Sequence, residues 1–238
     1  MNKFTFDEKK HLYYLDGKPL TGCTTVLSVI AKPTLIQWAA NMAVDYIQEI
    51  FTSGKDLNDD IFKEARTVHR KKKEKAGSVG TDTHKIIEYL IKFAITNNQG
   101  FLSEGVDENK LVENFRKWAI KNKVQFLESE KRMFSKKYWV GGTCDFTCII
   151  DNKKYVGDIK TSNGIYGREP FAQTACYRMM LEEMGEAGFE GSIIINIKKN
   201  GIFNENEDVH LSLYYKDDLE LFLAALKIYR IINNFKQN

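Results

Sequence analysis

The sequence predicts an α/β protein in which helices flank a mixed β-sheet and a helical segment precedes that sheet. Between about residues 34 and 127, the apolar residues recur with helical spacing. From 129 to 160 they fall instead into short runs separated by turn sequences, which is typical of strands. A helix, two more strands and a closing helix complete the pattern, and such a mixed order of elements favours helices packed on a sheet.

The first half of the chain is expected to be mainly helical. An N-terminal hairpin is predicted over residues 4–14, because aromatic and β-prone side chains precede the Asp-Gly turn sequence LDGKP. Helices are then expected, in order, over residues 34–51, over 59–76 with a stop at AGSVG, from Thr81 or Asp82 through HKIIEYLIKFAI, and over about 108–127.

The second half is expected to supply the sheet. Strands are predicted over 129–134, 140–150, 154–160, 191–199 and 209–215, with helices over about 170–184 and 216–235. No repeat, linker or low-complexity tract interrupts the 238 residues. We therefore expect one domain over 1–238, in which 1–76 forms an N-terminal hairpin and helical subregion and 77–238 forms the core.

Composition excludes several classes of protein. The formal net charge of +3 permits an acidic partner without demanding one. The four cysteines are spaced too irregularly for a zinc ribbon or a disulfide framework, which fits a reducing compartment. No signal pattern and no apolar run of roughly 20 residues is present, so we expect a soluble, cytoplasmic protein without a membrane partner. The basic run RKKKEK at 70–75 fits either a solvated helix face or a contact with a nucleic-acid backbone.

The strand sequence GDIK carries the most specific chemistry. It places Asp158 and Lys160 on one side of a strand and Ile159 on the other. In the preceding strand, GGTCDFTCII, Asp145 is expected to face away from Cys144 and Cys148. If antiparallel pairing brings the two aspartates together, Mg²⁺ or Mn²⁺ would relieve their repulsion, with the Ile159 carbonyl as a further oxygen ligand.

Two interpretations of the acid–lysine pair remain open from these residues alone. In a metal centre, Lys160 would orient the attacking water or offset developing negative charge during cleavage of a phosphodiester. In the simpler case, Asp158 and Lys160 form a surface ion pair worth about 0.5 kcal/mol and have no function.

Five motifs follow one another in a recognisable order. They are His84 in GTDTHKIIEYL, Glu130 in ESEKRMF, Asp145 in GGTCDF, Asp158 and Lys160 in GDIKTS, and Gln173 and Tyr177 in QTACY. Over about residues 77–185 this order resembles the PD-(D/E)XK nuclease superfamily, in particular its RecB-like exonuclease branch. The stretch TTVLSVIAKPTLIQWA is similar to the N-terminal portion of phage exonucleases and of the mitochondrial genome maintenance exonuclease.

The resemblance implies a restriction-endonuclease-like fold and a DNA exonuclease that depends on Mg²⁺ or Mn²⁺ and leaves 5′-phosphates. Asp145, Asp158 and the Ile159 carbonyl would be metal ligands. His84 would be a further ligand or, as is more common for a histidine on an amphipathic helix, a capping or packing residue. No iron–sulfur cluster is expected, because no cysteine follows Cys176.

The resemblance also suggests roles for residues around the metal ligands. Lys160 would be the catalytic lysine and Glu130 the supporting acid, although Glu128 has the same strand parity. Gln173 would orient Lys160 or a phosphate, and Tyr177 would bind the nucleic-acid backbone or simply pack in the core.

Four more residues are candidates for contact with nucleic acid. Thr161 and Ser162 could bind phosphate or serve as turn residues. Arg168 lies in a glycine-containing loop and either contacts the backbone or is only exposed to solvent. Trp139 could stack on a base. The expected partner is DNA with free ends, and a homo-oligomer or a recombination or replication protein is possible, in a phage or a bacterial cell.

Three other functions remain open: an idle nucleic-acid-binding module of the same fold, a sequence-specific endonuclease, and a structural protein. The sequence leaves open the polarity of digestion, the preference for single or double strands and for DNA or RNA, and the number of metal ions.

Overall fold

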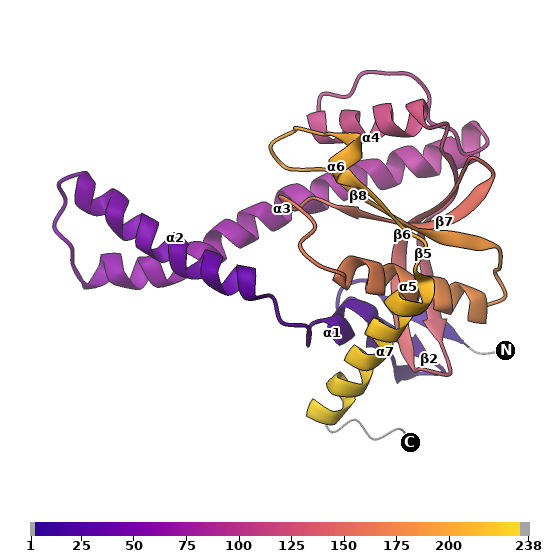
Figure 1. The fold of residues 1–238 in the computed structure, drawn as a ribbon, viewed down its shortest axis with the longest axis horizontal. Helices are drawn as coiled ribbons and strands as arrows, with labels where there is room; N and C mark the ends of the chain where they lie inside the picture. Colours follow the sequence, from indigo (N-terminus) through magenta and orange to yellow (C-terminus); the bar gives the residue numbers. More distant parts are fainter. Residues whose placement is uncertain (1–2, 234–238) are drawn as a thin grey trace. The chain divides into compact units, whose positions relative to one another are not determined.

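The computed structural model describes residues 3–233, which form two compact units (Figure 1). One unit contains the residues up to Ile30 and those from Thr83 onward, and the other contains Ala31–Asp82. The predicted α/β class is confirmed, because the first unit holds a mixed six-stranded sheet with helices on its faces. The single domain stays a prediction, and the residues up to Ile30 belong to the same unit as the sheet rather than to a separate N-terminal part.

The unit Ala31–Asp82 contains two antiparallel helical segments of the chain. Helix α2 (Pro33–Thr52) confirms the helix expected over 34–51, and it begins with proline, which is suited to a first helical position. It meets the first part of α3 (Asp59–Asn97) through an edge-on contact between Trp38 and His69 and through a hydrogen bond of 2.9 Å from Tyr46 Oη to Glu64 Oε2. No residue of α2 is fully buried.

Helix α3 contradicts the expected break at AGSVG. The structure has one continuous helix over Asp59–Asn97 where two were predicted. A glycine inside a helix costs only about 1 kcal/mol relative to alanine, because it keeps the backbone N–H that the helix needs. Burial of Ile87 and Ile91 later in the same helix offsets such a cost.

The six-stranded sheet is formed by segments that lie far apart in the sequence. Its strands run in the order β4-β6-β7-β8-β9, and β5 pairs with β6. Their bounds are Thr21–Gly22 for β4, Gln125–Ser135 for β5, Val140–Ile150 for β6, Lys153–Lys160 for β7, Phe189–Asn196 for β8 and Val209–Ser212 for β9. The pairs β7–β8 and β4–β6 are parallel and the other pairs are antiparallel. The crossover from β7 to β8 is made by α5 (Glu169–Glu183), as parallel pairing requires.

Two apolar cores fill the opposite faces of this sheet. On one face, α1 (Cys23–Leu27), α5 and α7 (Tyr215–Ile232) pack around Val156 and Phe222. On the other face, α4 (Lys110–Lys121) and the part of α3 that belongs to this unit pack around Phe115 and Phe146. A short helix, α6 (Glu205–Asp208), precedes β9.

The predicted N-terminal hairpin is confirmed and gains a third strand. Strands β1 (Phe4–Asp7), β2 (Leu12–Leu15) and β3 (Lys18–Pro19) form a small antiparallel sheet. The Asp-Gly sequence makes the turn between β2 and β3, where Asp16 and Gly17 have φ angles of 51° and 77°. Asp and Gly are the residue types that adopt such angles at low cost.

Most other predicted bounds agree with the structure to within a few residues. The clearest error is the helix expected over 108–127, because α4 ends at Lys121 and β5 begins at Gln125. Lys123, with a φ angle of 48°, lies between them, and β5 is held by its pairing with β6. The expected end of the last helix, at 235, lies outside the described residues.

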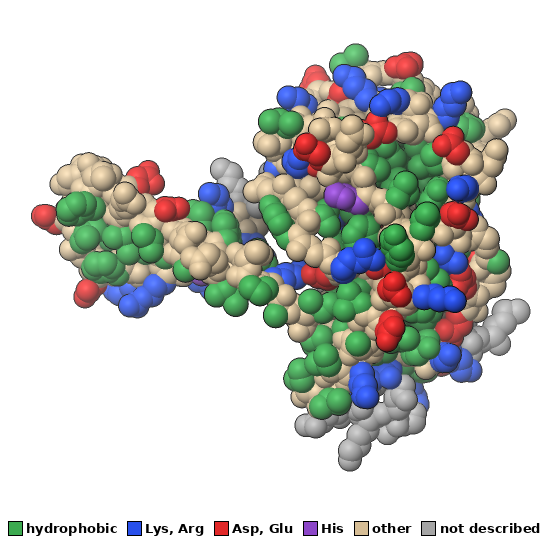
Figure 2. All heavy atoms as spheres, viewed as in Figure 1, with side chains coloured by type: hydrophobic (Ala, Val, Ile, Leu, Met, Phe, Trp, Pro, Cys, Tyr) green, Lys and Arg blue, Asp and Glu red, His purple; other side chains and the backbone are tan. Residues whose placement is uncertain are grey.

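Charges of both signs are mixed on the face of the molecule in Figure 2, where Lys and Arg side chains lie among Asp and Glu side chains. Neither sign dominates on this face. Within residues 3–233, no helix is long and apolar enough to cross a bilayer.

Candidate functional site

The candidate site lies where strands β6 and β7 separate. Their pairing ends at Phe146 and Gly157. In register, the next pair would be Asp145 and Asp158, but Asp158 pairs only with Ile194 of β8. The ring of Phe146 covers Gly157 so closely that a Cβ there would lie 2.0 Å from it. The last paired position therefore requires glycine, and a polar gap opens directly after it.

Asp145 turns its carboxylate into this gap. Its Oδ2 accepts a hydrogen bond of 2.6 Å from the backbone N–H of Ile159, which β6 no longer pairs. Opposite Asp145 on β5 is Glu130, between two residues that pair with the neighbours of Asp145, and its φ angle of 52° marks an irregularity in the strand.

The structure corrects the expected orientation of the cysteines. All four cysteines are free and buried, but those of β6 do not share one face. Cys144 belongs to the core beneath α5, whereas Cys148 belongs to the core beneath α4. Simple alternation along β6 therefore fails at Asp145, the position at which β6 stops pairing with β7.

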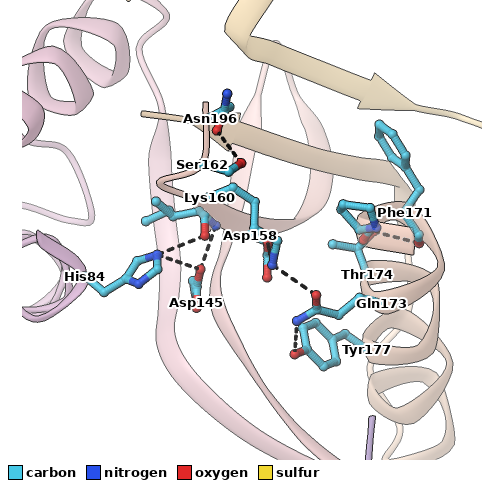
Figure 3. Close-up of polar contacts among 12 residues, drawn as sticks. His84, Asp145, Asp158, Lys160, Ser162, Phe171, Gln173, Thr174, Tyr177 and Asn196 are labelled. Carbon is cyan, nitrogen blue, oxygen red and sulfur yellow. Dashed lines mark hydrogen bonds and ion pairs between the residues drawn. The ribbon is translucent and has the colours of Figure 1, made fainter. Parts of the chain in front are cut away.

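A chain of hydrogen bonds and an ion pair runs from β7 to α5 (Figure 3). Lys160 Nζ lies 2.6 Å from Asp158 Oδ2 and donates to Gln173 Oε1 at 3.0 Å. Gln173 Nε2 donates in turn to the Tyr177 hydroxyl at 2.6 Å. The residue pair four apart on α5 thus faces the acid and lysine of β7, as helical spacing predicts. The Asp158 side chain is only 4% exposed, so this is not a surface ion pair.

On the other side of Asp145, a small cavity gathers acidic and imidazole groups. His84 and Glu88 of α3 line it together with Glu130, Asp145 and Ile159. His84 Nε2 lies 2.9 Å from the Ile159 carbonyl oxygen and 4.0 Å from Asp145 Oδ2. The cavity volume is about 10 Å³, which is near the space that one water molecule or one ion needs.

Burial and mutual repulsion raise the pKa values of two of these acids. Burial, followed by repulsion from Asp158, raises the pKa of Asp145 from 3.8 to about 6. Burial, followed by repulsion from Asp145 and Glu88, raises the pKa of Glu130 from 4.5 to about 7. Such shifts mean that burial and neighbouring negative charges outweigh the positive charge around these carboxylates. Acids with raised pKa values in a gap of this kind are typical of functional sites.

Lys160 provides only part of the missing positive charge. Burial alone would lower its pKa, but attraction to Asp158 and Asp145 outweighs burial, and the pKa of Lys160 is raised above 10.5. The lysine is therefore charged at neutral pH, forms its ion pair with Asp158 and attracts Asp145 from a greater distance.

The donor set fits a hard divalent cation. Among residues 3–233, no group of three or more His, Cys, Asp or Glu side chains stands ready to hold a metal ion. A cation here would be held by the carboxylates of Asp145 and Asp158 and the carbonyl of Ile159, with water completing its coordination. Mg²⁺ commonly binds proteins in this way, through one or two carboxylates. His84 already contacts the same carbonyl and could move into coordination.

One acid at the site was missed from the sequence. Glu88 lies in the cavity beside His84 and contributes to the raised pKa of Glu130. Its signal was the spacing of four residues from His84, which places both on one face of a helix. Of the two glutamates considered on β5, Glu130 lines the cavity, whereas Glu128 forms an ion pair of 2.5 Å with Lys131.

The residues expected to bind nucleic acid are spread over several parts of the sheet-containing unit. Thr161 and Ser162 follow Lys160, and Ser162 Oγ lies 3.2 Å from Asn196 Oδ1. Arg168 pairs with the buried carboxylate of Asp218. Trp139 and Tyr177 have partners within the protein, and their contacts with nucleic acid stay predictions. Trp139 packs against the small N-terminal sheet and donates to the Pro19 carbonyl, and Tyr177 is buried with its hydroxyl bound to Gln173.

No protein-family model matches the chain, and no curated protein matches it.

Proposed function

We propose that this protein is a metal-dependent DNA exonuclease of the PD-(D/E)XK type, which hydrolyses phosphodiester bonds and leaves 5′-phosphates. The observation that carries the proposal is that Asp145 and Asp158 stand at the first positions past the last β6–β7 pair, where repulsion from Asp158 contributes to the raised pKa of Asp145. Lys160 is bound there to both Asp158 and Gln173. The order of motifs in the sequence supports the same assignment.

Each group has a role that follows from its position. A bound Mg²⁺ or Mn²⁺ would polarise the scissile phosphate and lower the pKa of a water molecule. Asp145, Asp158 and the Ile159 carbonyl would hold the cation, and the ammonium of Lys160 would orient the attacking water and offset charge on the phosphate. Gln173 and Tyr177 are positioning residues, because they reach the reacting groups only through Lys160.

Energetics favour this function over a structural ion pair. Burying an ion pair costs desolvation energy that its attraction often does not repay, so a buried pair is weak evidence for stability. Here a second carboxylate lies beside the pair, and its pKa is raised to about 6. A purely structural site would gain stability by replacing Asp145 with asparagine, which keeps an acceptor for Ile159 N–H without the charge, whereas a metal site needs both acids.

Digestion of end-labelled DNA tests the proposal. Wild-type protein should degrade linear single- or double-stranded DNA with Mg²⁺ or Mn²⁺ and not with a chelator. Asp158→Asn should abolish cleavage, while Asp151→Asn, in the exposed turn between β6 and β7, should leave it unchanged. Asn tolerates the φ angle of 50° at position 151, so this control changes only a distant charge.

The same assay separates the alternatives. Binding of DNA without metal-dependent hydrolysis would identify an idle binding module. Defined fragments from circular DNA would identify a sequence-specific endonuclease, and the absence of both binding and hydrolysis would overturn the nuclease assignment.

A further inference from the structure

The loop between the candidate catalytic strand and α5 is held at both ends. It begins directly after Lys160, where Ser162 Oγ lies 2.9 Å from the Gly164 carbonyl oxygen and 3.2 Å from Asn196 Oδ1 (Figure 3). At the other end, the Arg168 guanidinium binds the carboxylate of Asp218, which is 3% exposed, and lies over the ring of Phe171. The residues between these anchors are therefore presented in a limited range of positions.

Tyr166 is the aromatic residue between the two anchors. It is 74% exposed, so its ring contributes little to the core. One part of the ring rests on Gly164, where an added Cβ would lie 3.1 Å from Tyr166 Cζ. The ring is thus supported from one side by the backbone of its own loop, while most of its surface remains open to solvent.

The loop lies at the end of the sheet where a substrate of Lys160 would bind. Strands β7 and β8 are parallel, and Lys160 pairs with Asn196 at their carboxyl ends. The Lys160 carbonyl also accepts a hydrogen bond of 2.7 Å from Ile197 N–H. In sheets with parallel strands, ligands bind at the carboxyl ends, and the loops that follow those ends contact them.

We infer that Tyr166 stacks on an unpaired base of the substrate strand, close to the phosphate that Lys160 faces. This inference rests on the proposed nuclease function and adds that the bound strand is single-stranded or frayed at this point, because a base paired and stacked in a duplex has no free face. An exposed ring is suited to such a contact, since stacking on aromatic side chains tolerates every base. Trp139, the aromatic residue expected from the sequence to stack on a base, is instead packed on the N-terminal sheet.

Equilibrium binding in the presence of a chelator tests the inference without cleavage. The probe is a fluorescent single-stranded oligonucleotide, and a series of probes carries one abasic site at successive positions. Tyr166→Ala should raise Kd about tenfold for the intact probe, and Tyr166→Phe should bind as wild type does. Gly164→Ala should weaken binding to a smaller extent, because its Cβ displaces the ring. Tyr14→Ala, on the N-terminal sheet, should have no effect.

The abasic series locates the stacked base. For wild-type protein, one abasic position should raise Kd about as much as Tyr166→Ala does, and at that position Tyr166→Ala should cause no further loss. Two results would overturn the stacking role of Tyr166 and leave the nuclease proposal intact. One is that Tyr166→Ala raises Kd by the same factor at every abasic position. The other is that Tyr166→Ala binds the intact probe as wild type does and still cleaves DNA. If wild-type protein binds no oligonucleotide, both this inference and the proposed function are wrong. If it binds, if Tyr166→Ala raises Kd and if no hydrolysis occurs with metal, only the proposed nuclease activity is wrong.

Discussion

Asp145 and Ile159 are joined across the point where two strands part: the carboxylate accepts a hydrogen bond of 2.6 Å from the backbone N–H that the sheet leaves unpaired. A buried N–H without a partner would be costly, so this bond stabilises the gap. It also fixes Asp145 beside the carbonyl of the same residue, which brings two oxygen groups together. The separation of β6 and β7 and the position of the acid are therefore parts of one arrangement.

Loss of Gln173 should impair turnover without impairing DNA binding. Gln173→Ala removes the acceptor that holds Lys160 Nζ, so we expect kcat to fall about tenfold or more while the Kd for DNA stays unchanged. Tyr177→Phe leaves the buried Gln173 amide without its acceptor and should lower the free energy of unfolding by roughly 1–3 kcal/mol. The control for Tyr177→Phe is Tyr155→Phe, which changes a buried tyrosine in the core on the other face of the sheet. An equal loss of DNA affinity and kcat in Gln173→Ala would contradict a positioning role.

Stability in a chelator should fall as pH rises from about 4 to about 8. The folded-state pKa values of Asp145 and Glu130, about 6 and about 7, lie above their unfolded values of 3.8 and 4.5. The folded protein therefore binds more protons than the unfolded chain in this range, and the free energy of unfolding decreases with pH. After allowance for solvent screening, the loss is on the order of 2 kcal/mol.

Urea denaturation at pH 5 and pH 8 measures this dependence. Glu130→Gln should remove part of it, and Glu104→Gln, an exposed acid on a loop, should not. Addition of Mn²⁺ should restore more stability at pH 8 than at pH 5, because the cation binds the ionised carboxylates. If the free energy of unfolding depends on pH equally in wild type and in Glu130→Gln, the Glu130 carboxyl does not have the raised pKa described above.

A side chain at position 157 should disrupt the gap from which the site is built. Gly157→Ala places a Cβ against the ring of Phe146 and should cost roughly 1–3 kcal/mol of stability, with loss of cleavage. Gly77→Ala is the matched control, because nothing lies within 4 Å of a Cβ there and alanine is the better helix former. Thermal melting of both variants checks the pair, and an unchanged melting temperature in Gly157→Ala would count against the close packing described above.

The role of Arg168 can be separated into two measurable effects. As an anchor for the loop, Arg168→Ala leaves the Asp218 carboxylate buried without its cation and should lower the melting temperature. As a phosphate contact, which the sequence suggested, its loss would reduce the salt dependence of DNA binding by about one released ion. We expect a lower melting temperature with an unchanged salt slope. A reduced salt slope at full stability would favour the phosphate contact.

Periodicity predicted the arrangement of the sheet well and the details of the gap poorly. Strand β6 was predicted with its observed bounds, because apolar alternation and turn residues are local signals. The change of face between Cys144 and Cys148 was not predicted, because it occurs where β6 loses pairing with β7, and such pairing depends on tertiary contacts. Strand parity alone therefore gave a wrong face for one cysteine.

Helical spacing predicted which residues share a helix face but not which of them belong to the site. It indicated that Gln173 and Tyr177 share a face, and the structure places both toward Lys160. The same spacing relates His84 to Glu88, but Glu88 was not predicted as a site residue, because nothing in the local sequence distinguishes a glutamate in a site from one in solvent. The continuous helix α3 was not predicted, because glycine often ends a helix although inside one it costs only about 1 kcal/mol.

The central claim is tested most directly by single-turnover release of 5′-phosphorylated nucleotides from DNA in Mg²⁺. We predict that Lys160→Ala reduces the rate by several orders of magnitude while binding DNA normally, and that Lys153→Ala, which removes an exposed lysine from the same strand, reacts at the wild-type rate. Equal rates for wild type and Lys160→Ala would contradict the account.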